Sequence, residues 1–296
     1  MDPNPQMNSF KQHSAFSSLI GNVNVKEKLT QFLLKDKIPK VLLFLGPIGI
    51  GKTRFAEAFA KAVIQTSQFP HPDIHTLYPD LETHQHPIAK LRELIQETLF
   101  PPFQSQYKVF IIGDIEKMVP TSMNTLLKTL EEPPADTLFI LTSSFPSEIL
   151  PTVLSRSSKI SFTPIADEDM VSFLMKHHGV SEEKGRKLAF LAEGSIAKAL
   201  ERLPHLPLLE GVKKALKATS YLEIYDCLSD KNLMVDTLSP DVIESLLEDI
   251  IYFVHEQDRG SLPRVLELIR ELRHALDHHV KLKTALEYFL ISYRLL

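Results

Sequence analysis

The chain has 296 residues, of which 44% are hydrophobic, so it can bury a large core and is expected to divide into two or three domains. Its formal net charge of −4 argues against a protein that binds DNA on its own, because such proteins are usually basic. The single cysteine, Cys227, has no second cysteine with which to form an internal disulfide. The sequence also shows no signal-peptide pattern and no apolar run long enough to span a membrane. We therefore expect a cytoplasmic protein.

Strand-like and helix-like patterns alternate through the first half of the chain. Short apolar runs are typical of buried parallel strands, and apolar residues three or four apart are typical of amphipathic helices. In chain order the patterns predict a helix over 24–35, a strand over 41–45, helices over 52–65 and 88–99, a strand over 109–112, a helix over 121–132, and strands over 137–142 and 159–162. The segment 67–87 is rich in proline and histidine and is predicted to be a loop. This alternation predicts an α/β domain in which helices cover both faces of a parallel sheet.

The pattern becomes purely helical after Pro164. Helical spacing covers residues 167–177, 181–192 and 195–203, and a stretch with two prolines at 204–207 is predicted to be a linker. The remaining residues are also helical in pattern. We therefore predict three domains, which are an α/β domain over 1–164, a small helical domain over 165–204 and a helical C-terminal domain over 205–296.

Residues 46–53 read Gly-Pro-Ile-Gly-Ile-Gly-Lys-Thr and fit the phosphate-loop pattern G-x-x-x-x-G-K-[ST] at every required position. An apolar strand precedes the loop and a helix follows it, as the motif requires. Backbone N–H groups and the helix N-terminus would face the phosphates, Lys52 would reach the β- and γ-phosphates, and Thr53 would hold Mg²⁺. The residues expected to bind nucleotide in this segment are Gly46, Pro47, Gly49, Gly51, Lys52 and Thr53.

A second part of the nucleotide site is expected at the end of another buried strand. Asp114 follows the apolar run 109–112 and could hold Mg²⁺ through water. The sequence therefore predicts a site for ATP and Mg²⁺, built from the phosphate loop and Asp114.

Several motifs then occur in the order found in one family. They are Met118, Asn-Thr-Leu-Leu-Lys-Thr-Leu-Glu-Glu-Pro-Pro over 124–134, Phe-Ile-Leu-Thr-Ser over 139–143 and Leu-Ser-Arg-Ser over 154–157. The chain resembles the bacterial DNA polymerase III clamp-loader subunits of the AAA+ class, and the resemblance spans roughly residues 16–200. It implies an AAA+ P-loop domain, a helical lid and a helical C-terminal collar that serves oligomerisation. It also implies a place in a hetero-pentamer of gamma/tau-type and delta-type subunits that loads the sliding clamp on primed DNA.

Two departures from the family pattern bear on ATP hydrolysis. Ile115 stands where the family's motor subunits carry a catalytic glutamate, and Ala197 stands where they carry an arginine that senses the γ-phosphate. Glu116 is a poor substitute if extended geometry persists, because it then points to the other face. The departures favour a delta-prime-type subunit that hydrolyses little ATP.

Three alternatives stay open. Glu116 leaves room for an active ATPase of the gamma/tau type. A P-loop phosphotransferase acting on a small molecule would need a substrate pocket and lid arginines. A structural adaptor would differ only in whether the loop holds nucleotide.

The resemblance also implies a role for Arg156, in the segment 154–157. The matching arginine of the family reaches across a subunit boundary to the γ-phosphate held by a neighbour. A guanidinium suits this task because it is always charged and offers a planar fork of donors. Arg156 is thus the expected arginine finger, acting in trans.

The resemblance extends to His71-Pro72-Asp73, but the four cysteines of the family's zinc module are absent. Structural zinc sites are built mainly on cysteine thiolates. The nearby histidines are interpreted as solvated loop residues, and they are His71, His75, His84 and His86. No zinc is expected.

Overall fold

The structure is a computed structural model that describes residues 15–35, 37–218, 220–228, 240–257 and 262–294. The chain divides into two units, Met1–Ala197 and Lys198–Leu296. The predicted three-domain boundaries, after residues 164 and 204, stay a prediction. No helix of the described ranges is both long enough and apolar enough to cross a lipid bilayer.

The first unit is built on one parallel sheet of five strands in the order β2-β3-β4-β1-β5. The strands are β1 (Val41–Leu45), β2 (Ile74–Leu77), β3 (Lys108–Ile112), β4 (Thr137–Ser143) and β5 (Ser158–Ser161). The four strands predicted from apolar runs are confirmed to within about one residue at each end, as expected for boundaries of this kind. The predicted fold class, an α/β domain with a parallel sheet followed by helices, is confirmed.

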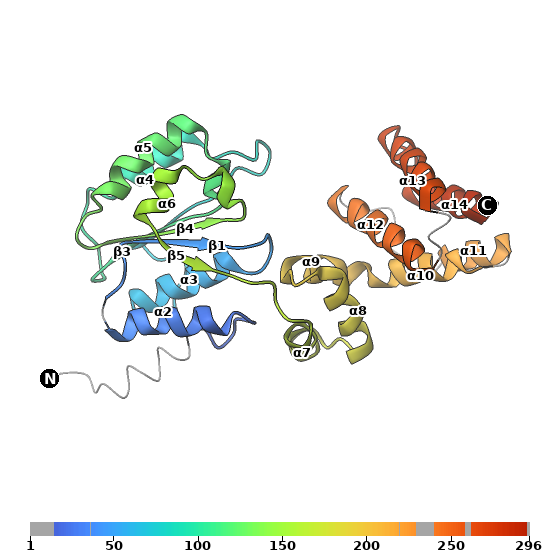
Figure 1. Ribbon diagram of the computed structural model, residues 1–296, viewed down its shortest axis with the longest axis horizontal. Helices are drawn as coiled ribbons and strands as arrows, with labels where there is room; N and C mark the ends of the chain where they lie inside the picture. The colour runs from blue at the N-terminus through green and yellow to red at the C-terminus, as the bar shows by residue number, and fades with distance from the viewer. Residues whose placement is uncertain (1–14, 36, 219, 229–239, 258–261, 295–296) are drawn as a thin grey trace. The chain divides into compact units, whose positions relative to one another are not determined.

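Helices cover both faces of this sheet (Figure 1). One face carries α2 (Val23–Lys35) and α3 (Lys52–Val63), and the other carries α4 (Ile88–Glu97), α5 (Pro120–Glu131) and α6 (Pro151–Arg156). Successive side chains of a strand point to opposite faces. Accordingly Leu42 and Phe44 of β1 belong to the core beneath α2 and α3, whereas Val41 and Leu43 belong to the core beneath α4, α5 and α6. Burial on both faces explains why the strands read as continuous apolar runs.

The segment 67–87 was predicted to be a loop, and this prediction is wrong for its centre, which forms β2. Ile74 and Leu77 are buried and pair in register with Val109 and Ile112 of β3. β2 is a short edge strand with only two buried apolar residues, which is too weak a pattern to be recognised within a proline-rich segment. Its pairing is supplied by β3, from a distant part of the chain.

Asp73, directly before β2, holds a loop in place. Its buried carboxylate accepts hydrogen bonds from the backbone N–H groups of Phe103, Gln104 and Ser105 at 2.5–2.9 Å. Burial pushes the pKa of Asp73 upward, but these hydrogen bonds outweigh it and hold the pKa below its ordinary value. The carboxylate therefore ties the segment between α4 and β3 to the start of β2.

We expect Asp73→Asn to lower the free energy of unfolding by about 2–3 kcal/mol at pH 7, because an amide nitrogen would face N–H donors that need an acceptor. Since folding lowers the pKa of Asp73, its stabilisation is fully present above the unfolded-state pKa of about 3.9 and is lost as the pH falls below that value. Urea unfolding at pH 7 and pH 3 measures both effects. The exposed Asp136→Asn serves as control, and an equal loss at both pH values would contradict the assignment.

Three helices follow the sheet, α7 (Asp167–His178), α8 (Glu182–Ala192) and α9 (Ile196–Arg202). They confirm the helices predicted from apolar spacing. The predicted linker 204–207 is wrong, because residues Leu203–His205 form a 3₁₀ turn and Pro207 lies in the first turn of α10 (Leu206–Leu216). Proline is tolerated in a first helical turn, where its missing N–H would have no intrahelical partner.

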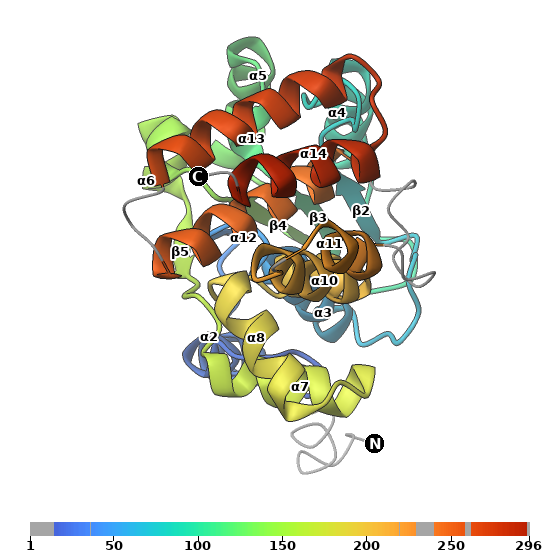
Figure 2. The ribbon, with the colours of Figure 1, turned by 90° about the vertical axis from the view of Figure 1, so that its right-hand side faces the viewer.

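The second unit is helical throughout its described ranges. Its further helices are α11 (Tyr221–Leu228), α12 (Pro240–Gln257), α13 (Leu262–Asp277) and α14 (Leu282–Arg294). α13 and α14 lie side by side, as Figure 2 shows, and both pack through buried apolar faces. Arg202 and Asp249 form a buried ion pair at 3.3 Å within this unit, which connects the end of α9 to α12.

Candidate functional site

The phosphate loop lies between the end of β1 and the start of α3. The φ angles of Gly49 and Gly51 are +77° and +97°, conformations that residues with a side chain rarely adopt. A Cβ atom on Gly49 would also lie 2.1 Å from Ser195 Oγ. Both positions therefore require glycine for backbone geometry, and Gly49 requires it for close packing as well.

The backbone N–H groups from Gly49 to Arg54 donate to no acceptor within the part of the chain that the structure describes. They lie at the N-terminus of α3, where unpaired N–H groups and the helix dipole favour a negative charge. This row of donors is of the kind that a phosphate group needs, and phosphate binding here stays a prediction. Thr53 is half-buried within the row, in the first turn of the helix.

Lys52 is only 6% exposed, and its ammonium is fully hydrogen-bonded. It donates to Gly46 O and Pro47 O, both at 2.7 Å, and to Ser144 Oγ at 2.9 Å. Burial lowers the pKa of Lys52, while the negative charges of Asp114 and Glu116 act in the opposite direction. The predicted loop lysine is thus held beside two carboxylates and Ser144, which follows β4.

Asp114 lies at the carboxyl end of β3, as predicted. Its φ of +46° places it in the left-handed region, and its backbone N–H donates to Thr142 Oγ1 of β4 at 3.1 Å. Its carboxylate is 40% exposed and lies 3.8 Å from Lys117 Nζ. A partly exposed carboxylate at this edge of the sheet suits an ion held through water.

Ile115 and Glu116 do not continue the strand, because a 3₁₀ turn over Ile115–Lys117 follows Asp114. Ile115 is fully buried in the core beneath α4, α5 and α6. Glu116 Oε1 accepts a hydrogen bond from Ser144 N at 2.9 Å, and Oε2 is buried without a partner among the described residues. The extended geometry under which Glu116 would point away does not persist, and its carboxylate lies near Lys52.

Two residues, Ser144 and His86, were not predicted from the sequence to lie at this site. Ser144 bonds both Lys52 Nζ through its hydroxyl and Glu116 through its backbone N–H, so it joins the ends of β1, β3 and β4. His86 is buried, with Nε2 3.1 Å from Asp114 O, and burial lowers its pKa. No local motif marks either residue, since both reach the site only through the fold.

The histidines interpreted as solvated loop residues are mostly not solvated. His86 packs against Asp114, His75 stacks on Phe110 in the sheet, and His71 Nδ1 accepts a hydrogen bond from Asp73 N at 3.1 Å. His84 alone of the four is exposed. The described residues contain no group of three or more His, Cys, Asp or Glu placed to hold a metal ion.

The segment around Ala197 contacts the phosphate loop through its backbone. Ala197 N donates to Gly49 O at 3.0 Å, and the buried Ser195 packs against Gly49. The position that was compared with a phosphate-sensing arginine therefore presents a peptide N–H to the loop.

Arg156 lies apart from this set of contacts, at the last residue of α6. Its Nη1 donates to Thr152 O at 3.1 Å, and its Nη2 lies 2.9 Å from Glu131 Oε1. The side chain remains 37% exposed. It is thus accessible on the surface of the first unit, as an arginine acting on another subunit must be.

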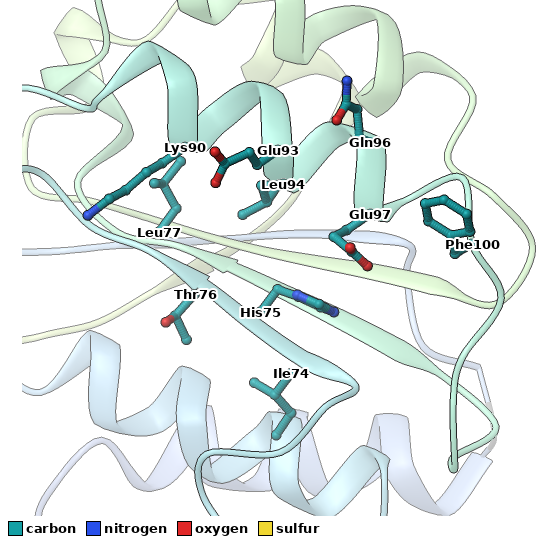
Figure 3. Close-up of a pocket in the computed structure, with 10 residues that line it drawn as sticks. All are labelled: Ile74, His75, Thr76, Leu77, Lys90, Glu93, Leu94, Gln96, Glu97 and Phe100. Atoms are coloured by element: carbon teal, nitrogen blue, oxygen red, sulfur yellow. The ribbon is translucent and has the colours of Figure 1, made fainter.

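A separate cavity of about 610 Å³ lies between β2 and α4 (Figure 3). His75, Glu93 and Glu97 are among the side chains that line it, and none of the predicted nucleotide-site residues does so. β2 is an edge strand and β1 lies three places further along the sheet, so this cavity is distinct from the phosphate loop.

Residues 21–166 match the family model described as DNA polymerase III, delta subunit. The DNA polymerase III subunit tau of Bacillus subtilis is 27% identical over 86% of this chain and 52% of its own length. Protein STICHEL-like 2 of Arabidopsis thaliana is 30% identical over 74% of this chain and 28% of its own length. The chain thus spans about half or less of the length of these curated relatives.

Solved structures share the fold. A DNA polymerase III gamma subunit-related protein of Thermotoga maritima superposes with a TM-score of 0.53 at 17% identity, over 90% of this chain and 98% of that one. The Thermotoga maritima RuvB Holliday junction branch migration motor superposes with a TM-score of 0.50 at 17% identity, over 81% of this chain and 78% of that one. With the ordered motifs and the phosphate-loop geometry, these similarities to the DNA polymerase III delta-subunit family model and to the gamma and tau subunits support a clamp-loader-family AAA+ protein.

Proposed function

We propose that the chain is a delta-prime-type clamp-loader subunit of DNA polymerase III. In this role it assembles with gamma/tau-type and delta-type subunits into a hetero-pentamer that loads the sliding clamp on primed DNA. It supplies Arg156 to a neighbouring subunit's nucleotide and hydrolyses little ATP itself. The family match supports the assembly, and the exposed guanidinium of Arg156 supports the finger role.

The residues of the phosphate loop fit ATP with Mg²⁺. The free N–H groups from Gly49 to Arg54 would receive phosphate oxygens, and Lys52 would exchange a protein acceptor for the β- and γ-phosphates. The hydroxyl of Thr53 and the carboxylate of Asp114 would hold Mg²⁺, directly or through water. When bound, the ion neutralises charge on the phosphates.

One observation carries the proposal of low turnover. Ile115 occupies the position of the family's catalytic glutamate, and it is fully buried in the core. An isoleucine can neither orient nor deprotonate a water molecule, and the loss of a general base typically costs about 10²–10⁴ in rate. A second catalytic group is missing, because Ala197 stands where the family's motor subunits carry an arginine, and its side chain has no charge to interact with a γ-phosphate.

A second candidate function is an active gamma/tau-type ATPase, and the position of Glu116 favours it. The carboxylate of Glu116 accepts the N–H of Ser144, whose hydroxyl binds Lys52, so a carboxylate does lie at the phosphate loop. Its Oε2, however, is buried, and Oε1 already accepts the Ser144 N–H. This limits its access to a water molecule.

Steady-state ATP hydrolysis by the purified chain distinguishes the two candidates. We expect wild-type turnover to be no higher than that of Lys52→Ala, because Ile115 has no carboxylate and that of Glu116 is engaged with Ser144, so neither can activate water. Lys61→Ala, in the same helix but remote from the loop, is the matched control. Brisk turnover that Lys52→Ala and Glu116→Gln both abolish, and Lys61→Ala spares, would instead establish the gamma/tau type.

A further inference from the structure

The Glu-Glu-Pro-Pro run at 131–134 has no role in the proposed function so far. Its first residue, Glu131, is the last residue of α5. A carboxylate at a helix C-terminus is unfavourable, because the negative end of the helix dipole lies there. Helix stability therefore does not explain a glutamate at this position.

The partner of Glu131 is Arg156, at the C-terminus of α6. Glu131 Oε1 lies 2.9 Å from Arg156 Nη2, and the two side chains are 49% and 37% exposed. An ion pair this accessible contributes little to stability, since solvent screens it. The pair does, however, place a carboxylate oxygen beside one terminal nitrogen of the guanidinium.

The remaining contacts of Arg156 come from its own helix. Nη1 donates to Thr152 O at 3.1 Å and to Ser155 Oγ at 3.4 Å. A guanidinium has five N–H donors, and in the described ranges only Nη1 donates hydrogen bonds, while Nη2 is paired with Glu131 as an ion pair and Nε–H has no partner. Arg156 is thus held on one side, while donors on the other side stay available.

We propose that Glu131 is a positioning residue for the arginine finger. It holds one edge of the Arg156 guanidinium from within the subunit, so that the other edge meets a phosphate of the neighbouring subunit in a single orientation. This inference rests on the proposed finger role of Arg156. Glu131 itself touches neither nucleotide nor water.

The test is ATP hydrolysis by the reconstituted complex containing the full chain with Glu131→Ala or Glu131→Gln. Because loss of alignment acts on the transition state, we expect Glu131→Ala to lower kcat about tenfold with KM unchanged. Glu131→Gln keeps an oxygen at the same reach and should retain more activity. Glu132→Ala, the adjacent exposed glutamate, is the control and should match wild type.

Three outcomes overturn the inference, and they differ in meaning. If Glu131→Ala keeps wild-type kcat while Arg156→Ala loses it, the finger role stands and the positioning role is wrong. If Arg156→Ala itself has no effect, the proposed function fails and the inference with it. Thermal melting of each variant supplies the readout for a purely structural role, and a lowered melting temperature for Glu131→Ala but not for Glu132→Ala would also count against positioning.

Discussion

Arg156→Ala is expected to lower ATP hydrolysis by the neighbouring motor subunit about 10³–10⁵-fold in the reconstituted complex, the range measured for arginine fingers supplied in trans. The charge that develops on the transferred phosphoryl group is stabilised by donors already aimed at it. Arg156 provides such donors, since contacts to Thr152, Ser155 and Glu131 hold its guanidinium while the side chain stays accessible. Removing it should leave assembly intact, because its ion pair is exposed and contributes at most about 1 kcal/mol.

The measurement is single-turnover ATP hydrolysis, with gel filtration to confirm that the complex assembles. Arg186→Ala is a matched control, because Arg186 is also an exposed arginine paired with a glutamate, Glu182, on the same chain. Arg156→Lys should recover only part of the rate, since a lysine keeps the charge but not the planar fork. Unchanged turnover by a fully assembled Arg156→Ala complex would contradict the finger role.

The parts of the site that sequence predicted are those in which one local segment supplies the geometry. The phosphate loop is such a segment, because its glycines, Lys52 and the helix N-terminus follow one another in the chain. Asp114 was predictable because it follows a short apolar run of the kind typical of a buried parallel strand. In both cases the residue types and their neighbours along the chain were sufficient for the prediction.

Residues that enter the site through the fold could not be predicted in the same way. Ser144 meets Lys52 and Glu116 only because β4 lies between β1 and β3 in the sheet. His86 belongs to a segment that composition marks as loop, yet it is buried against Asp114. Strand order decides both contacts, and no single pattern in the sequence specifies strand order.

The direction of Glu116 shows how one dihedral angle changes an inference about chemistry. Alternation along a continuing strand would send Glu116 to the other face. Asp114 instead adopts a φ of +46° and a 3₁₀ turn begins, so Ile115 enters the core and Glu116 turns toward Ser144. Side chains near strand ends are therefore less predictable than those within strands.

Because of this geometry, we predict that restoring the family's sequence motif at position 115 would not restore its activity. Ile115→Glu would restore the family's Asp-Glu pair in sequence, but we expect it to unfold the first unit rather than create an ATPase. The new carboxylate would enter a fully buried apolar site, where it loses hydration without gaining a partner. Together with the lost burial of the isoleucine, the free energy of unfolding should fall by more than about 4 kcal/mol.

Urea unfolding followed by circular dichroism, with steady-state ATP hydrolysis, measures the two consequences of Ile115→Glu. Ile115→Val is the control for the position itself and should cost only about 1 kcal/mol, because one methyl group is removed without burying a charge. A folded Ile115→Glu protein with wild-type stability and increased turnover would show that position 115 can face the nucleotide. The turn after Asp114 would then have two accessible arrangements, and the buried position of Ile115 would be a consequence of its apolar side chain rather than of the backbone.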